Sequence, residues 1–98
     1  MRRGTTPTHV IETDISLVDA TEIYVTYAQG HIRLEKTIDD VTIETDKVTT
    51  ELTQQDTLAM SSIGEVSIQI RAKFPDGTAV ASQIMKRPAK EILKNGVI

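Results

Sequence analysis

The side chains that could carry metal or acid–base chemistry are few and far apart in this sequence. His9 and His31 are its two histidines, and it has no cysteine, which excludes a thiolate metal site, a cysteine nucleophile and any disulfide bond. The two histidines lack the close spacing that brings two imidazoles to one metal ion. We therefore expect both to be solvated strand residues, and we predict no metal ligand.

Two groups of carboxylates could serve acid–base or calcium chemistry. Asp39 and Asp40 are adjacent, so on an extended chain they point to opposite faces, whereas an acid–base pair must face one reacting bond. Asp14, Asp19 and Glu22 cluster in sequence, but the alternating oxygen ligands around a central glycine of a calcium loop are missing. We expect turn and loop roles for all five.

Serine and glycine patterns offer no alternative chemistry. Residues 61–64, Ser-Ser-Ile-Gly, do not form the Gly-x-Ser-x-Gly elbow that exposes a nucleophilic serine, and no histidine follows them. The five glycines are scattered and match neither a phosphate-binding loop nor a dinucleotide fingerprint. The sequence therefore predicts a protein that is not an enzyme, with no catalytic residue, no cofactor and no cofactor-binding residue.

The composition indicates one globular domain made of strands. The chain has 98 residues, of which 39% are hydrophobic and 26% charged, the balance of a folded domain. Aromatic residues make up 3%, so Ile, Val and Leu must supply the core, and their β-branched members favour a sheet. The net charge of −3 argues against a nucleic-acid partner, and the apolar stretches are too short for a membrane span or a signal peptide.

Alternation of apolar and polar side chains predicts seven strands. They cover residues 8–13, 23–28, 31–35, 41–44, 48–52, 66–73 and 78–86. Gly30 and the Pro75-Asp76-Gly77 segment predict hairpin turns, because glycine tolerates the positive φ that such turns need. In residues 78–86 both sets of alternate side chains are partly apolar, so the faces of that last strand stay unassigned.

Two further segments break the period of two. Thr53 and Asp56 resemble a capping box, which predicts a single helical turn within residues 53–60. Residues 89–95 indicate a short helix or a tail that stops at a glycine. Short strands without β–α–β alternation favour one all-β domain over residues 1–98, an antiparallel immunoglobulin-like sandwich, with a small barrel as the alternative.

Several segments of the sequence carry a resemblance to a known family. Residues 1–9 (MRRGTTPTH), 23–29 (IYVTYAQ), 52–58 (LTQQDTL), 68–71 (IQIR) and 76–82 (DGTAVAS) resemble short structural-cassette proteins of Gram-positive phages and prophages. Residues 18–21 and 75–77 are more loosely similar to the N-terminal β domain of phage baseplate upper proteins. The resemblance implies a virion structural or assembly protein, made in the bacterial host cytoplasm, whose partners are other virion proteins or itself.

The termini are the candidate interaction sites. An arm, residues 1–7, precedes the first predicted strand, and a tail, residues 89–98, follows the last. The candidate residues are Arg2, Arg3, Ile92, Leu93, Val97 and Ile98. Because the tail has too many apolar residues for an idle terminus, we expect it to cover a sheet edge on its own subunit or on a neighbour. The alternative function is a stand-alone β-sandwich module that binds a peptide or glycan.

Overall fold

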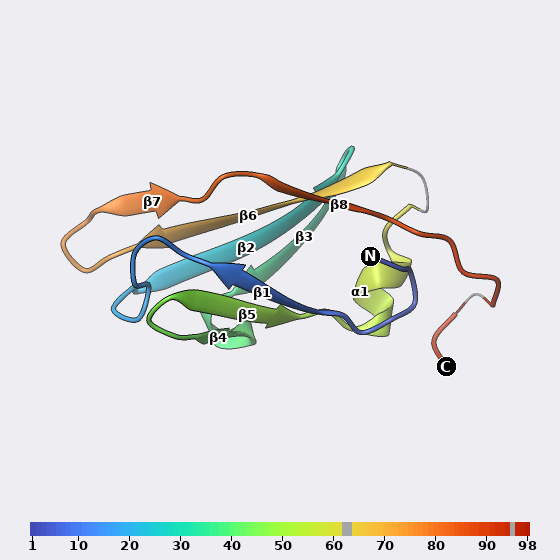
Figure 1. Ribbon diagram of the computed structural model, residues 1–98, viewed down its shortest axis with the longest axis horizontal. Coiled ribbons are helices and arrows are strands. Elements are labelled where there is room, and N and C mark those ends of the chain that lie inside the picture. The colour runs from blue at the N-terminus through green and yellow to red at the C-terminus, as the bar shows by residue number, and fades with distance from the viewer. Residues whose placement is uncertain (62–63, 95) are drawn as a thin grey trace.

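The computed structural model describes residues 1–61, 64–94 and 96–98, and these residues contain eight strands and two short helical turns (Figure 1). The strands are β1 (Thr8–Glu12), β2 (Glu22–Gln29), β3 (Ile32–Thr37), β4 (Val41–Ile43), β5 (Lys47–Glu51), β6 (Glu65–Lys73), β7 (Ala79–Ala81) and β8 (Met85–Pro88). The turns are the 3₁₀ helix η1 (Ile38–Asp40) and the α-helix α1 (Gln54–Leu58). Neither turn is long and apolar enough to cross a membrane.

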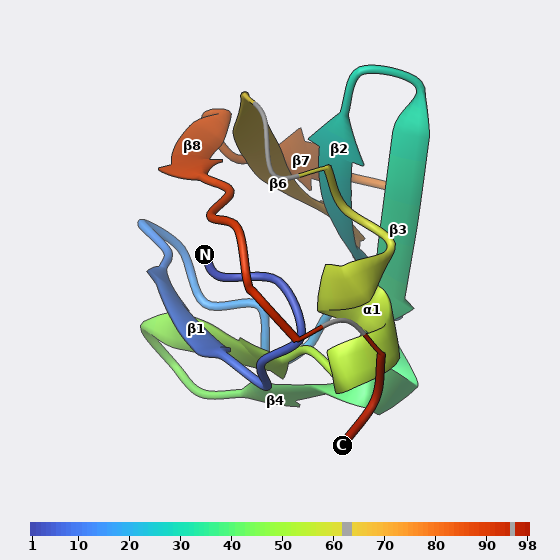
Figure 2. The same cartoon turned by 90° about the vertical axis from the view of Figure 1, so that its right-hand side faces the viewer.

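The strands form two antiparallel sheets, which confirms the all-β prediction. One sheet has three strands in the order β1-β5-β4. The other has five strands, in the order β3-β2-β6-β7, with β8 also paired to β6. Figure 2 shows β1 and β4 in one layer and β2, β3, β6 and β8 in the other.

The hydrophobic core lies between these sheets and follows from the alternation in the sequence. On β2, Ile23, Val25 and Tyr27 are buried, while the residues between them are partly or fully exposed. Every second residue of β6 is also buried, as expected for a central strand. The three-stranded sheet contributes Ile11 and Val48 to the same cluster. The prediction that residues 66–73 form a central strand is confirmed, because β6 pairs with β2 on one side and with β7 and β8 on the other.

The last predicted strand is two strands, which is why the described residues contain eight strands and not seven. Residues 71–73 pair with 79–81, and residues 65–68 pair with 85–88, so residues 69–70 face residues 82–84. The later strand thus has one residue more than β6 at this point, which is a β-bulge. The extra residue shifts the alternation, so that even-numbered side chains face inward before the bulge and odd-numbered side chains after it. Val80 before the bulge and Met85 after it both pack against the core. The faces of this segment could not be assigned from the sequence because they exchange within it.

The predicted helical turn is confirmed, whereas a C-terminal helix is not. Thr53 caps α1 by accepting a hydrogen bond from the Asp56 N–H at 3.1 Å, and the Asp56 carboxylate accepts one from the Thr53 N–H at 2.8 Å. Residues 89–94 contain no helical turn, so the tail alternative holds for them. A parallel bridge between Arg2 and Lys90 joins the arm to the start of the tail. Ser62, Ile63 and Asn95, parts of two predicted segments, lie outside the described residues.

Candidate functional site

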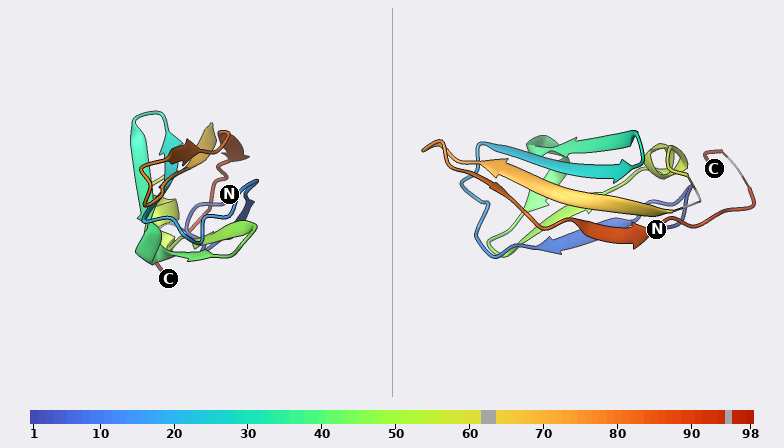
Figure 3. Two further views of the ribbon diagram at one scale, coloured as in Figure 1. Left: turned by 90° about the vertical axis from the view of Figure 1, so that its left-hand side faces the viewer. Right: turned by 90° about the horizontal axis from the view of Figure 1, so that it is seen from above.

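On one side of the molecule the edge strands of both sheets have no neighbouring strand among the described residues, although the Met1 amino group donates to the Pro88 carbonyl at the end of β8. β1 pairs with β5 along one edge, and β7 and β8 pair only with β6 among the described strands. Both edges border the same side of the molecule, which we call the open side (Figures 1 and 3). An unpaired edge presents backbone N–H and C=O groups that can bind another extended chain.

A groove of about 650 Å³ lies on the open side, between the end of β1 and the bulge that separates β7 from β8. Apolar side chains of Ile11, Leu17, Val80 and Met85 form much of its lining. The loop that follows β1, residues 13–21, supplies further lining residues. The site thus combines an apolar floor with free strand edges, which is the chemistry that holds an extended peptide segment.

The borders of the groove are acidic on one side and apolar in two places. Glu12 and Asp14 lie in its lining and are exposed. Ile15, also in the lining, is 49% exposed, and Ile84, between the lining residues Gln83 and Met85 in the chain, is 60% exposed. Large apolar side chains gathered in water around a groove are typical of a surface that a partner covers.

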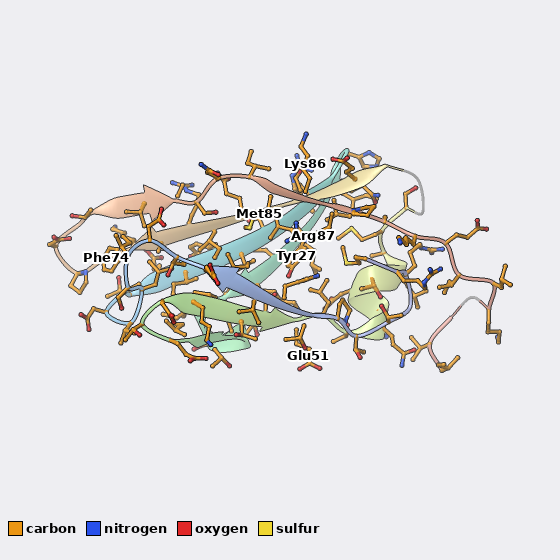
Figure 4. All side chains as sticks on the ribbon, in the orientation of Figure 1. Tyr27, Glu51, Phe74, Met85, Lys86 and Arg87 are labelled. Carbon is orange, nitrogen blue, oxygen red and sulfur yellow. The ribbon has the colours of Figure 1, made fainter. Side chains whose placement is uncertain are left out.

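A buried chain of polar groups crosses between the sheets. His9 Nδ1 on β1 lies 2.8 Å from the Tyr27 hydroxyl on β2, and that hydroxyl lies 2.5 Å from Thr50 Oγ1 on β5. Burial, with a smaller contribution from the positive charge of Arg87, lowers the pKa of His9, and burial raises the pKa of Tyr27. Figure 4 labels Tyr27 and Arg87 near the middle of the long axis.

The expectation that both histidines are solvated is therefore wrong for His9 and right for His31. His9 is half-buried because its ring packs against the Tyr27 ring, with the centroids 5.6 Å apart. His31 is exposed in the turn after Gly30. No set of three or more metal-ligating side chains comes together within the described parts of the chain. The polar chain joins the two sheets and is a structural feature.

The predicted turn and loop roles agree with the structure for four of the five carboxylates, whereas Glu22, expected in a loop, is the first residue of β2. Asp39 and Asp40 lie in η1, where the Asp40 carboxylate accepts a hydrogen bond from the Thr37 N–H at 3.0 Å. That bond lowers the pKa of Asp40. Asp14 and Asp19 are exposed in the loop between β1 and β2.

Three of the candidate interaction residues are engaged within their own chain. The Arg2 guanidinium donates to the Glu91 carbonyl at 2.7 Å, and the Arg3 guanidinium donates to the Leu58 carbonyl at 3.0 Å. Ile92 is half-buried, and its methyl group packs so closely on Gly4 that a Cβ there would lie 2.8 Å from it. The contacts of Arg2 and Ile92 fasten the arm to the tail, and the contact of Arg3 fastens the arm to the end of α1.

The other candidate residues are exposed at the end of the tail. Leu93 is 99% and Ile98 88% exposed, and Val97 is also exposed. Backbone groups of Ile98 make two hydrogen bonds to the exposed amide of Gln54, at 2.8 and 3.0 Å. Figure 2 shows the tail passing beside α1. The tail therefore contacts its own chain lightly and leaves its apolar side chains in water.

Sequence reasoning placed the interaction site at the termini and missed the groove. Ile15 and the bulge at residues 82–84 come together because the two sheets pack on each other, which joins segments about 70 residues apart in the chain. The one available signal was the mixed alternation within residues 78–86, which marked an irregular strand.

Comparison of the chain with protein-family models, with curated proteins and with solved structures found no match.

Proposed function

We propose that this chain is a non-enzymatic structural or assembly protein of a phage or prophage particle, which acts through protein–protein contacts. The observation that carries the proposal is the open side, where two unpaired sheet edges border a groove with an apolar floor. The phage setting is supported by the sequence resemblance alone. In that setting the chain is made in the host cytoplasm and then enters the virion.

We further propose that the two sheets form an immunoglobulin-like sandwich. Such domains place strands A, B, E and D in one sheet and C, F and G in the other, with C′ beside C in the variable type. The orders β1-β5-β4 and β3-β2-β6-β7 correspond to B-E-D and C′-C-F-G, with β8 continuing strand G. The strand without a counterpart among the described residues is A, which would pair with β1.

This correspondence gives the docking surface a physical basis. In the four-stranded sheet of the constant type, strand A covers the edge of strand B. Here the residues before β1 make one backbone bond to that sheet, from the Leu52 N–H to the Pro7 carbonyl at 3.0 Å, and then run to Lys90. The edge of β1 is left open to a strand from another protein, the recognition mode called β-augmentation.

The groove also favours a second function, a stand-alone module that binds a peptide ligand. Its apolar floor and free strand edges suit an extended peptide better than a glycan, because sugar sites use aromatic faces and none of the described lining residues is aromatic. The two functions differ in the partner: a particle protein remains bound in an assembly, whereas a peptide ligand exchanges.

The test of the structural role is the protein content of purified particles from a lysogen that carries the coding sequence. We expect mass spectrometry to find the chain in particles after repeated density-gradient purification, in a fixed ratio to the major capsid protein. Particles that lack the chain, while it is present in the cell lysate, would contradict the structural role and favour the peptide-binding alternative.

A further inference from the structure

We propose that the partner on the open side is a second copy of this chain, which docks head-to-tail with its tail in the groove. This inference rests on the proposed function and makes it specific, since it names the partner and the two surfaces that meet. Three observations carry it: the charges at the two ends of the long axis, the apolar tail, and the position of the tail relative to the groove.

The end of the molecule nearer to the groove is acidic. The Thr13 N–H donates to the Asp46 carbonyl at 2.9 Å, and the Thr21 N–H donates to the Lys73 carbonyl at 2.8 Å, so three loops share this end. The end comprises residues 12–22, 44–47 and 73–78, which hold seven acidic and two basic side chains, a net charge of −5. We call it the acidic end.

The opposite end is basic. The arm and the chain after β8, residues 1–7 and 89–98, hold four basic side chains and one acidic side chain, a net charge of +3. Glu65 and Arg33 at the same end cancel each other, and so do Asp56 and Lys36 of the ion pair at α1. We call it the basic end. A chain with a small net charge thus carries opposite charges at the ends of an axis 47 Å long, which favours association of unlike ends over association of like ends.

The exposed apolar side chains of the tail and the apolar lining of the groove are also complementary. The exposed Leu93, Val97 and Ile98 of the tail need apolar cover, and the groove offers Ile11, Leu17, Val80 and Met85 with Ile15 at its border. Lys90 at the start of the tail would meet Glu12 and Asp14 beside the groove. Apolar burial would supply most of the affinity, and the charges would set the orientation.

The groove of one molecule does not reach the end that carries the tail, since its lining residue Met85 lies near the middle of the long axis (Figure 4). Figure 1 and the right panel of Figure 3 both place the β6–β7 turn at one end of the long axis and the C-terminal residues at the other. The hydrogen bonds between Ile98 and Gln54 hold the tail beside α1, away from the groove. The tail that enters a groove therefore comes from a neighbour, and because the two surfaces differ, each added copy leaves a free groove and a free tail.

The test uses two variants that each disable one surface. Ile15→Asp adds a charge at the groove and leaves the tail intact, whereas Leu93→Asp adds a charge on the tail and leaves the groove intact. Both side chains are exposed, so neither variant disturbs the core. Val10→Asp is the matched control, because Val10 is 57% exposed on the outer face of β1.

Sedimentation velocity of the full chain measures the result. We expect the wild type and Val10→Asp to grow beyond dimers with concentration, and each groove or tail variant alone to have a dissociation constant at least about tenfold weaker. An equal mixture of Ile15→Asp and Leu93→Asp should restore wild-type affinity but stop at two chains, because it contains one intact groove–tail pair.

Two results would overturn the proposal. One is a wild type that stays monomeric up to millimolar concentration, which leaves docking on a different particle protein as the surviving function. The other is a mixture that shows no heterodimer while the wild type associates, since this would mean that the contact does not join groove to tail. Absence of the chain from particles, by contrast, would contradict the structural role without bearing on self-association.

Discussion

The Tyr27 hydroxyl is a single group that links the two sheets by hydrogen bonds. It belongs to a fully buried side chain and bonds to His9 on one strand and Thr50 on another, both in the facing sheet. A buried hydroxyl is costly unless it is paired, and the groups that it pairs would be left unsatisfied without it. The polar chain therefore fixes how the sheets face each other.

Removal of this hydroxyl tests its contribution to stability. We expect Tyr27→Phe to lower the free energy of unfolding by about 1–2 kcal/mol, because Thr50 loses its hydrogen-bond partner in a buried position. Urea denaturation measures the change. The control is Tyr24→Phe, which removes an exposed hydroxyl that bonds to Glu22 at 3.2 Å and should change stability by less than about 0.5 kcal/mol. Equal effects of the two variants would contradict the assigned role.

The lowered pKa of His9 predicts a pH dependence of stability. The folded chain holds a proton on His9 less readily than the unfolded chain, whose His9 has its ordinary pKa of 6.5. The stabilisation is therefore complete above about pH 6.5 and is lost as the pH falls toward the depressed folded-state pKa. We expect thermal unfolding to show this loss, and His9→Gln to abolish it while His31→Gln keeps it. A loss that persists in His9→Gln would assign it to another group.

Sequence reasoning at this scale succeeded for the core and failed for His9. The buried positions of β2 and β6 follow from the period of two, because successive side chains of a strand face opposite ways. His9 shares its face with buried Ile11, so the alternation also turned it inward, but its partner Tyr27 lies on a different sheet. The pattern of one strand contains no information about such a partner.

At the scale of elements, an ion pair between Asp56 and Lys36 attaches α1 to β3. The Asp56 carboxylate accepts a hydrogen bond from the Thr53 N–H and lies 2.8 Å from the Lys36 ammonium on β3, in an ion pair with both side chains largely covered. Burial alone would raise the pKa of Asp56, but the bonds from Lys36 and Thr53 outweigh it and lower that pKa. Asp56 thus caps the helix and fastens it to the edge of the larger sheet.

We expect Asp56→Asn to lower the free energy of unfolding by about 1–2 kcal/mol, through the loss of a charged cap and of a partly buried ion pair. Because the pKa of Asp56 is lowered in the folded chain, the difference from wild type should be full above about pH 4 and shrink as the carboxylate is protonated at lower pH. Asp39→Asn, which changes an exposed carboxylate in η1, is the control. A variant as stable as the control at neutral pH would contradict the assignment.

The elements themselves could be predicted, but their junctions could not. The capping box and the turn glycines are local signals, and α1 and the two hairpins were found from them. The bulge between β7 and β8 depends on the register of β6 against a strand that follows it, and so does the groove beside it. Local patterns do not fix that register to one residue.

For the whole molecule, the separation of charge along the long axis predicts that salt weakens association. Raising the ionic strength from about 0.1 M to about 1 M shortens the Debye length from about 10 Å to about 3 Å, which screens the attraction between the acidic and basic ends. We expect the dissociation constant to rise with salt while the circular dichroism spectrum keeps its β-sheet form. Tighter association at high salt would mean that apolar contacts alone join the copies.

The open side is also a property of the whole molecule, and composition could not reveal it. The sequence marks apolar residues of the tail as candidates for interaction, but a covering surface for them requires the relative placement of β1, the following loop and the bulge. These segments are far apart in the sequence and come together only in the folded chain. The net charge of −3 likewise conceals two ends of opposite sign.

Amide hydrogen exchange of the full chain at micromolar and at millimolar concentration tests most directly whether the groove of one copy receives the tail of another. Exchange reports which backbone groups become covered, independently of any substitution. We predict that protection rises with concentration in residues 11–17, 80–85 and 91–94 together, while the outer strands β3 and β4 stay unchanged. Association with unchanged protection in these segments, or protection in the groove without protection in the tail, would contradict the account.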